Sequence, residues 1–319
     1  MTPDFPARRP GPRPRAWRGV TSIVGAALLV AASVVPVAAD PPTKRGDWGE
    51  PVAVAAANTA AHDGCPIESP NGKELYIAST RDGGHGKNDI WVAQRQNKHQ
   101  PWGTMENLGS AINTADHEFC PTPLGGGWLL FVSDRQACGA TPGMNPPVGD
   151  MYLTRRHPDG SWATPQHLGC VADGTGPNFS GGEFGPSLVS TRGETYLYFS
   201  STGTTGNHDI YRSRQDRDGR FGTPQAVTEL NTAAVDQMPN VSADATEIVF
   251  ASNRGGNMDI WTATFDRKTG RWSSPVPVAA VNTLEPETRP SLSGDRSRLY
   301  FGRGATADIY VSTRAEIDR

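Results

Sequence analysis

The sequence predicts an all-β fold, a five-bladed β-propeller built from four-stranded blades. An Asp followed by an apolar and then an aromatic residue recurs five times, and successive Asp positions are 61, 59, 50 and 49 residues apart. The five acids of this motif are Asp89, Asp150, Asp209, Asp259 and Asp308. No long stretch after the first forty residues has helical periodicity. Four short strands repeated at an interval of 40–60 residues are typical of a propeller blade.

The unit over residues 236–276 shows the parts of one predicted blade. A short strand over 240–242 is followed by a turn and then by an apolar, β-rich strand over 247–252. A Gly-rich loop leads into an alternating strand over 259–265, and a further turn leads into a fourth strand over 271–276. The Asp of the motif opens the third strand, where we expect it to bond backbone N–H groups of the Gly-rich loop.

The last unit ends near Arg314 without a fourth strand, and a matching segment lies at the other end of the chain. Residues 48–54 (Trp-Gly-Glu-Pro-Val-Ala-Val) match residues 272–278 (Trp-Ser-Ser-Pro-Val-Pro-Val) and precede the first unit. We therefore expect residues 48–54 to pair with residues 308–314 and to complete the last blade. Such closure removes the exposed edges that an open sheet would have.

The order of motifs within each unit points to a known repeat. It runs acidic-x-x-Pro, a Ser-Pro-Asp-Gly-Lys-like turn, an aromatic-rich strand, Ser-x-Arg, Gly-Gly and then Asp-Ile-Trp/Tyr, and residues 69–73 (Ser-Pro-Asn-Gly-Lys) are close to that turn. Over about residues 47–314 this pattern resembles the WD40-like repeat of the TolB type. The resemblance implies a propeller that serves as a binding scaffold. TolB itself has six blades and a second domain, and this chain shows neither pattern.

The first 39 residues have the pattern of a secretory signal peptide. A basic region is followed by the mostly apolar run 20–35 and by small residues at 37–39, so we expect cleavage near Ala39. An uncleaved membrane anchor is the alternative, because the apolar run is close to the length that spans a bilayer. The predicted organisation is a signal peptide (1–39), a short linker (40–47), one propeller domain (48–314) and a C-terminal tail (315–319).

Charge and export narrow the classes of partner. Residues 40–319 contain 25 basic and 32 acidic residues, a formal net charge of −7. An acidic exported protein is a poor candidate for binding nucleic acid or an anionic membrane surface. We expect a secreted or extracytoplasmic monomer that has no stable membrane insertion after signal cleavage and no cofactor.

An acid lies three residues before the Pro in the first strand of each unit. These acids are Asp63, Glu118, Glu183, Asp236 and Glu287. Ser-x-Arg motifs end the second strand at Arg81, Arg135 and Arg254, and Arg303 has an approximately equivalent position. We expect each acid to bond an Arg or a Ser hydroxyl and so to fix strand to loop or blade to blade. The alternative is a ring of carboxylates around the channel that binds a cation or a basic partner.

Four histidines are expected on the same face as these acids. His62 and His117 directly precede two of the acids, His85 lies in the loop of the first unit, and His208 precedes the motif Asp of the third unit. The ligand-face candidates are therefore His62, Asp63, His85, His117, Glu118, Glu183, His208, Asp236 and Glu287. One alternative places a transition metal between His62 and His117, with Asp63 and Glu118 as further ligands.

The four cysteines allow three disulfide pairings. Cys138 lies in the long loop 136–149 and Cys170 begins the long connection 170–183, and we expect these two to form a disulfide that fixes the loop. Cys65 and Cys120 share a register in adjacent units, so a second bridge would join two inner strands. Equivalent positions on adjacent inner strands can be too far apart for disulfide geometry, so this second pairing stays open.

The preferred functional hypothesis is a binding module. It would recognise an envelope or extracellular protein, peptide or glycan on its loop face, where the unequal loops 136–149 and 170–183 break the symmetry of the repeat. The alternative is a glycan-cleaving hydrolase that uses two axial carboxylates. No single acid stands outside the repeated set, so the sequence assigns no catalytic residue.

Overall fold

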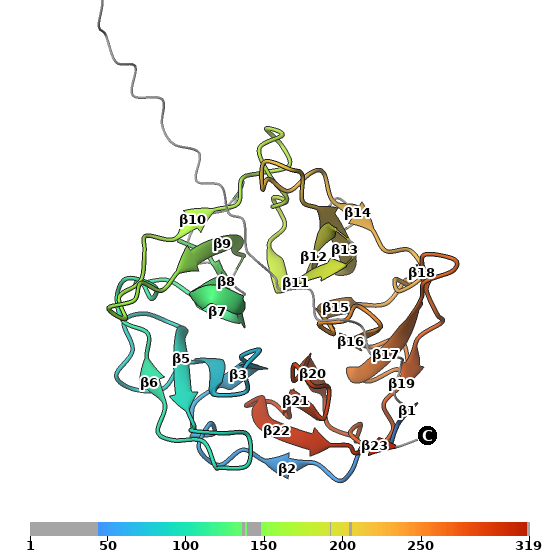
Figure 1. The fold of residues 1–319 in the computed structure, drawn as a ribbon, viewed down its shortest axis with the longest axis horizontal. Helices are drawn as coiled ribbons and strands as arrows, with labels where there is room; N and C mark the ends of the chain where they lie inside the picture. The colour runs from blue at the N-terminus through green and yellow to red at the C-terminus, as the bar shows by residue number, and fades with distance from the viewer. Residues whose placement is uncertain (1–43, 136–137, 139–147, 192, 204–205, 318–319) are drawn as a thin grey trace, which may run out of the picture.

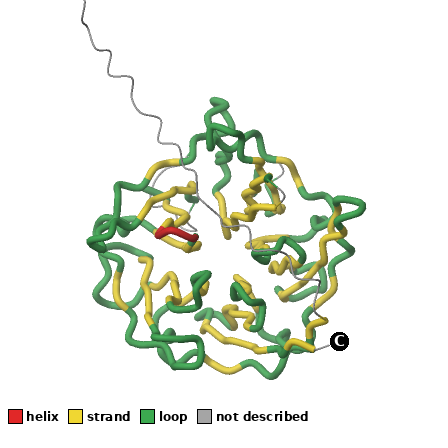
Figure 2. The backbone as a smooth tube through the Cα atoms, in the orientation of Figure 1, coloured by secondary structure: helices red, strands yellow, loops and turns green. Residues whose placement is uncertain are grey.

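The five predicted blades are present, arranged as a ring around a central axis (Figure 1). The computed structural model describes residues 44–135, 138, 148–191, 193–203 and 206–317. Figure 2 shows strands and loops around the ring and, among these residues, one short 3-10 turn, η1 (Gly125–Gly127). No helix in the described part of the chain is long and apolar enough to cross a membrane. The predicted signal peptide, residues 136–137 and residues 139–147 lie outside the described residues.

Each blade is an antiparallel sheet, and in the first four blades the strands follow one another in sequence. The first blade contains β3 (Asp63–Glu68), β4 (Glu74–Ser79), β5 (Asp89–Gln94) and β6 (Glu106–Asn107). The second contains β7 (Glu118–Pro123), β8 (Trp128–Ser133), β9 (Asp150–Arg155) and β10 (Gln166–His167). The third contains β11 (Glu183–Thr191), β12 (Glu194–Ser201), β13 (Asp209–Arg214) and β14 (Gln225–Ala226).

The fourth blade has a divided outer strand. It contains β15 (Asp236–Val241), β16 (Glu247–Ser252), β17 (Asp259–Asp266), β18 (Arg271–Trp272) and β19 (Val276–Pro277). Both β18 and β19 pair with β17, so the continuous fourth strand expected over 271–276 is wrong. β18 forms a hairpin with the end of β17, and the chain pairs with the middle of β17 again only at β19. Residues 273–275, between the two pieces, belong to neither strand.

The N-terminal segment closes the ring as predicted. The fifth blade contains β20 (Glu287–Leu292), β21 (Arg298–Arg303), β22 (Asp308–Thr313) and β2 (Val52–Ala53). Val52 pairs with Val311 and Ala53 with Tyr310, so the outer edge of β22 is covered by the start of the chain. Beside this contact, the two-residue strands β1 (Lys44–Arg45) and β23 (Glu316–Ile317) pair with each other.

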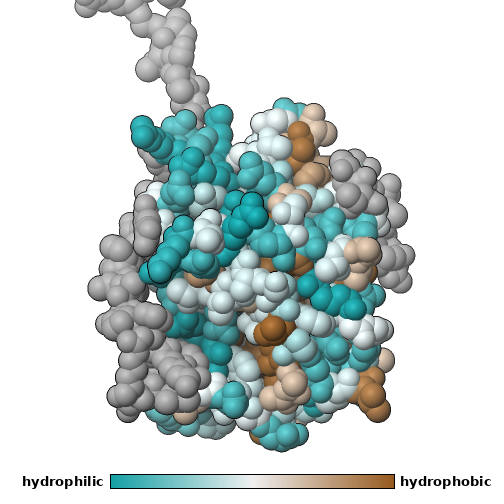
Figure 3. Space-filling view, turned by 90° about the vertical axis from the view of Figure 1, so that its right-hand side faces the viewer, coloured by the Kyte–Doolittle hydropathy of each residue, from teal (hydrophilic) through white to brown (hydrophobic). Residues whose placement is uncertain are grey.

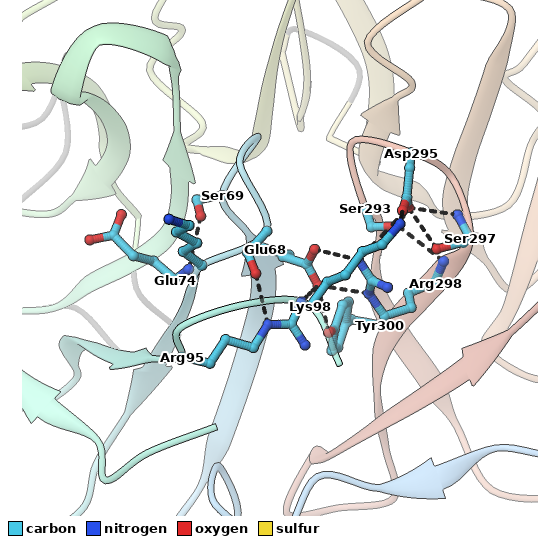
Figure 4. A network of polar contacts seen from close by, with 12 residues as sticks. Glu68, Ser69, Glu74, Arg95, Lys98, Ser293, Asp295, Ser297, Arg298 and Tyr300 are labelled. Carbon is cyan, nitrogen blue, oxygen red and sulfur yellow. Dashed lines mark hydrogen bonds and ion pairs between the residues drawn. The ribbon is translucent and has the colours of Figure 1, made fainter. Parts of the chain in front are cut away.

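A buried glutamate joins the first and last blades (Figure 4). Glu68, at the end of β3, forms ion pairs with Arg298 of β21 at 2.7 Å and with Arg95 of its own blade at 2.9 Å. The Tyr300 hydroxyl, also from β21, donates a hydrogen bond to the same carboxylate at 2.7 Å. This network connects the two blades where the ring closes.

The core lies between neighbouring blades, and every blade contributes a large apolar residue at the same register. The fourth residue of β4, β8, β16 and β21 and its counterpart in β12 are large, apolar and fully buried. These residues are Ile77, Phe131, Phe199, Phe250 and Phe301. Their burial removes apolar surface from water, which is the main favourable contribution to folding.

Every inner strand has a β-bulge at the same position. The register shifts between Gly64 and Ile67 in β3, and an equivalent shift occurs in the other four inner strands. The residue in the bulge has a positive φ in all five blades: Cys65 (50°), Cys120 (47°), Gly185 (59°), Met238 (54°) and Arg289 (56°). A bulge redirects a side chain, and these five positions, called the axial positions below, line the centre of the ring.

Candidate functional site

The five inner-strand acids are fully buried, with an exposed fraction of 0% for each. Asp63 accepts a hydrogen bond from the Ser79 hydroxyl at 2.5 Å and forms an ion pair with Arg81 at 2.7 Å. Equivalent ion pairs join Glu118 to Arg135, Asp236 to Arg254 and Glu287 to Arg303. The structural role expected for these acids is therefore seen in four blades.

This burial corrects the expectation that the acids lie on the ligand face. A carboxylate with no exposed surface and a guanidinium partner cannot contact an external ligand without breaking that pair. The correction applies to Asp63, Glu118, Asp236 and Glu287, and it extends to Glu183 because that carboxyl also has no exposed surface. Their carboxylates fix the blades internally.

A second repeated motif, which the sequence analysis missed, binds the same acids. In four blades an Asn-Thr pair lies just upstream of the acid, and the Thr N–H and hydroxyl both donate to the carboxylate, as Thr59 does to Asp63 at 2.6 and 2.8 Å. The Asn side chain bonds the backbone of the third strand, as Asn113 does to Ile90 at 2.9 and 3.0 Å. In these four blades the Thr lies four residues before the acid, and this fixed spacing is the signal in the sequence that could have revealed the motif.

The third blade departs from both patterns. Phe179 replaces the threonine, and Gly203 stands where three other blades have the arginine of Ser-x-Arg. Glu183 keeps only the Phe179 N–H at 2.8 Å and the Ser201 hydroxyl at 3.0 Å, both on Oε1. Its buried Oε2 has no hydrogen-bond partner among the described residues. Burial, with the charge of Asp150 nearby, raises the pKa of Glu183 well above its usual range.

The blade connections and the loops between second and third strands meet on one face, called the loop face below. The backbone N–H of Glu118 donates to Asn88 of the preceding blade at 2.6 Å, and that of Glu287 donates to Met258 at 2.7 Å. Glu183 and Asp236 bond the preceding blade in the same way. Each blade is thereby fixed to the next at this face.

The four candidate histidines lie along this face. His85 is exposed, whereas His62, His117 and His208 are half-buried. Burial lowers the pKa of all three half-buried histidines, and the positive charge of Arg289 lowers that of His62 further. These rings are therefore neutral at neutral pH.

The structure does not assemble the metal site considered at His62 and His117. Asp63 and Glu118 are already bonded to arginines. Among the described residues, the cluster whose possible ligand atoms all lie within 4.8 Å contains Cys138, Asp150, His167 and Cys170. Its two cysteines are joined to each other, so their sulfurs are not available as thiolate ligands.

The disulfide between Cys138 and Cys170 confirms the first predicted pairing. It lies beside His167, a residue not singled out from the sequence, whose Nε2 is 2.5 Å from Oδ2 of Asp150. Asp89 shows the expected closure of the Gly-rich loop, accepting the N–H groups of His85 and Gly86 at 2.5 and 3.2 Å. In the second blade His167 has the position of Asn107 in the first, whose side-chain amide likewise donates to the motif Asp, at 2.8 Å.

A small pocket opens on the axis, formed by the five inner strands. The proline that follows each axial position lines it, and these prolines are Pro66, Pro121, Pro186, Pro239 and Pro290. Its polar groups come from the axial positions and from Thr122, Asn240 and Ser291. No Asp or Glu belongs to this lining among the described residues.

Two free thiols and a guanidinium meet in the pocket. The Sγ atoms of Cys65 and Cys120 are 2.9 Å apart, and both cysteines are free and buried. Burial opposes ionisation of Cys65, but its hydrogen bond with Cys120 and the charge of Arg289 outweigh this effect and lower its pKa to about 7. Burial and the hydrogen bond with Cys65 raise the pKa of Cys120. The pair therefore ionises in two steps, and the first removes one proton that the two sulfurs share.

Comparison with known proteins gives the fold and no closer relation. The sequence matches no protein-family model and no curated protein. The structure is similar to the catalytic domain of a GH62 α-L-arabinofuranosidase from Coprinopsis cinerea, with a TM-score of 0.55 and 11% identity over 86% of this chain and 98% of that chain. An α-L-arabinofuranosidase from Lactobacillus brevis gives 0.54 and 11% over 82% and 94%.

A structure described as a TolB protein from Agrobacterium tumefaciens also matches. It is 17% identical, covers 82% of this chain and 78% of its own, and has a TM-score of 0.46. At these identities the similarities show the fold alone. The chain is a five-bladed β-propeller, as its repeats predict.

Proposed function

We propose that this protein is an exported binding module that recognises an extracytoplasmic protein, peptide or glycan on its loop face. The observation that carries this proposal is that the inner-strand acids are occupied in contacts within the protein. All five inner-strand carboxylates are buried, and four are neutralised by arginines. Among the described residues no Asp or Glu lines the axial pocket, so the pocket offers neither the paired carboxylates that hydrolysis needs nor a carboxylate ring for a cation.

The loop face offers groups suited to polar recognition. Exposed His85 and half-buried His62, His117 and His208 present imidazole rings, whose nitrogens can form hydrogen bonds with a polar ligand. The disulfide between Cys138 and Cys170 fixes the connection 170–183 at the same face, and it supports an oxidising, extracytoplasmic location. The side of the ring shown in Figure 3 is mainly hydrophilic, with separate hydrophobic patches.

The proposal is tested by measuring how the mature chain, residues 40–319, binds to a glycan array and to overlapping peptides from envelope proteins. The variants His85→Ala and His62→Ala should each weaken binding of the identified ligand about tenfold, equivalent to ~1.4 kcal/mol. Lys98→Ala is the matched control, because Lys98 pairs with Asp295 in exposed turns between other strands. Equal losses in all three variants would contradict a site on the loop face.

The alternative function is glycan hydrolysis, and Glu183 is the residue that favours it. Burial raises the pKa of Glu183, and a raised pKa favours the protonated form that a general acid requires. Its complete burial weighs against the reaction, as does the lack of any Asp or Glu among the described residues that line the axial pocket. Release of sugar from a glycan panel by the wild-type chain, abolished in Glu183→Gln, would replace the binding proposal with this one.

A further inference from the structure

The axial positions carry side chains that the fold itself does not require. Positive φ is unfavourable for residues with a Cβ and free for glycine. The third blade has Gly185 at this position and still forms the same bulge. The other blades nevertheless place Cys65, Cys120, Met238 and Arg289 there, at a cost in backbone strain that glycine would avoid.

Three of these four side chains are sulfur donors. The Cys65 and Cys120 thiols touch, with 2.9 Å between their Sγ atoms, and Met238 lines the same pocket from the fourth blade. Both cysteines are free, unlike Cys138 and Cys170. Thiolate and thioether sulfurs are soft ligands, and a set of two thiolates and one thioether without carboxylate or imidazole selects Cu(I).

The fourth side chain supplies the charge that such a site needs. When two thiols bind Cu⁺, each loses its proton to solvent, two Cu–S bonds form and the complex has a net charge of −1. Arg289 lines the same pocket as the two cysteines, so its positive charge lies where it can offset that charge. Its buried Nη1 has no hydrogen-bond partner in the described part of the chain. Gly64 makes room for this guanidinium, because a Cβ there would collide with Nη1.

We propose that Cys65, Cys120 and Met238 bind one Cu(I) ion on the propeller axis, with Arg289 balancing its charge. The step is ligand exchange without oxidation or reduction. The two sulfurs must move apart to admit the ion, and the axial pocket between the inner strands provides the space. This site is independent of the ligand proposed for the loop face, and either can fail alone.

Anaerobic titration of the protein with Cu(I), in competition with a chromophoric Cu(I) chelator, tests the site. We expect one tightly held copper per chain and a first coordination shell of sulfur alone by X-ray absorption. Cys65→Ser and Cys120→Ser should each abolish competition with the chelator. Arg289→Gln should weaken binding about 10–100-fold, as is usual for groups that support a metal ligand from outside, and Arg289→Lys should restore most of it.

Two controls assign the copper to the axis. Met238→Leu should weaken binding, whereas Met105→Leu, which removes a buried thioether from another core cluster, should not. The double variant Cys138→Ser/Cys170→Ser should keep its copper. Circular dichroism checks that each variant is folded.

Several results would overturn the proposal. One is failure of the reduced wild-type chain to hold copper against the chelator. Another is copper retention by Cys65→Ser/Cys120→Ser. A third is a disulfide between Cys65 and Cys120 in protein isolated from the exporting cell under thiol-blocking conditions, because an oxidised pair has no thiolate for the metal.

Discussion

Gly203 lies in the third blade at the position where three other blades have the arginine that binds the inner-strand acid, and Glu183 has no guanidinium partner among the described residues. The fifth blade keeps a guanidinium partner for its acid. Its Arg303 has the position of Ser79 in the first blade, and it binds Glu287 from there. The third blade therefore buries a carboxyl without a countercharge, and the raised pKa of Glu183 follows from that burial.

Glu183 makes the stability of the protein depend on pH. Its pKa is raised in the folded protein, whereas in the unfolded chain it ionises near the ordinary value of about 4.3. Stability from this group is fully present below the unfolded pKa and is lost as the pH rises from there through the folded pKa. Glu183→Gln imitates the protonated acid. Its Tm should exceed that of wild type at pH 7 and equal it below about pH 4.

Glu118→Gln is the matched control for this comparison. It leaves Arg135 without its carboxylate, and breaking a buried pair costs about 3–5 kcal/mol. Thermal melts of both variants across the pH range distinguish the two environments. A loss of stability in Glu183→Gln at pH 7 comparable to that in Glu118→Gln would show that Glu183 is ionised in the folded protein.

The network at Glu68 should contribute strongly to ring closure. Glu68→Gln removes the charge bound by Arg95 and Arg298, so we expect a loss of about 3–5 kcal/mol in the free energy of unfolding. Lys98→Ala removes the neighbouring exposed pair with Asp295, seen in the same view (Figure 4), and should cost less than about 1 kcal/mol. Denaturant unfolding of the two variants measures both values, and similar costs would contradict the assignment.

Removal of the closing strand should destabilise the whole ring. A mature chain that begins at residue 56 lacks β2 and the contacts of residues 48–54, and it exposes the edge of β22. We expect a lower Tm and concentration-dependent association by light scattering. A chain that begins at residue 46 loses β1 but keeps β2, and it should melt and scatter like the chain that begins at residue 40. Indistinguishable behaviour of both truncations would exclude closure by this strand.

The disulfide should stabilise the second blade against unfolding. It closes a loop with a sequence separation of 32 residues, for which the chain-entropy model gives about 3–4 kcal/mol. Cys138→Ser/Cys170→Ser should therefore lower the Tm, with about 2–4 °C for each kcal/mol in a domain of this size class. Peptide mapping of the non-reduced wild-type protein should find Cys138 linked to Cys170. A free thiol at Cys138 would contradict the pairing.

The sequence by itself determined the architecture. The number of blades and the closing role of residues 48–54 followed from patterns that repeat along the chain. The pairing of Cys138 with Cys170 followed from the two long segments that depart from the repeat. Such patterns can be read locally, because each blade is one supersecondary unit with the same strand order and the same turn chemistry. The acid-arginine pairs were predicted for the same reason, since Asp63 and Arg81 belong to one unit.

The tertiary structure decided what the repeated residues do. Burial of the five acids depends on how neighbouring blades cover them, and the sequence pattern alone also allowed an exposed ring. The axial cluster depends on ring closure, which brings Cys65 and Cys120 to 2.9 Å across 55 residues of chain and places Met238 and Arg289 in the same pocket. Equivalent positions in different blades converge only where all five inner strands meet, and that convergence is a property of the closed ring.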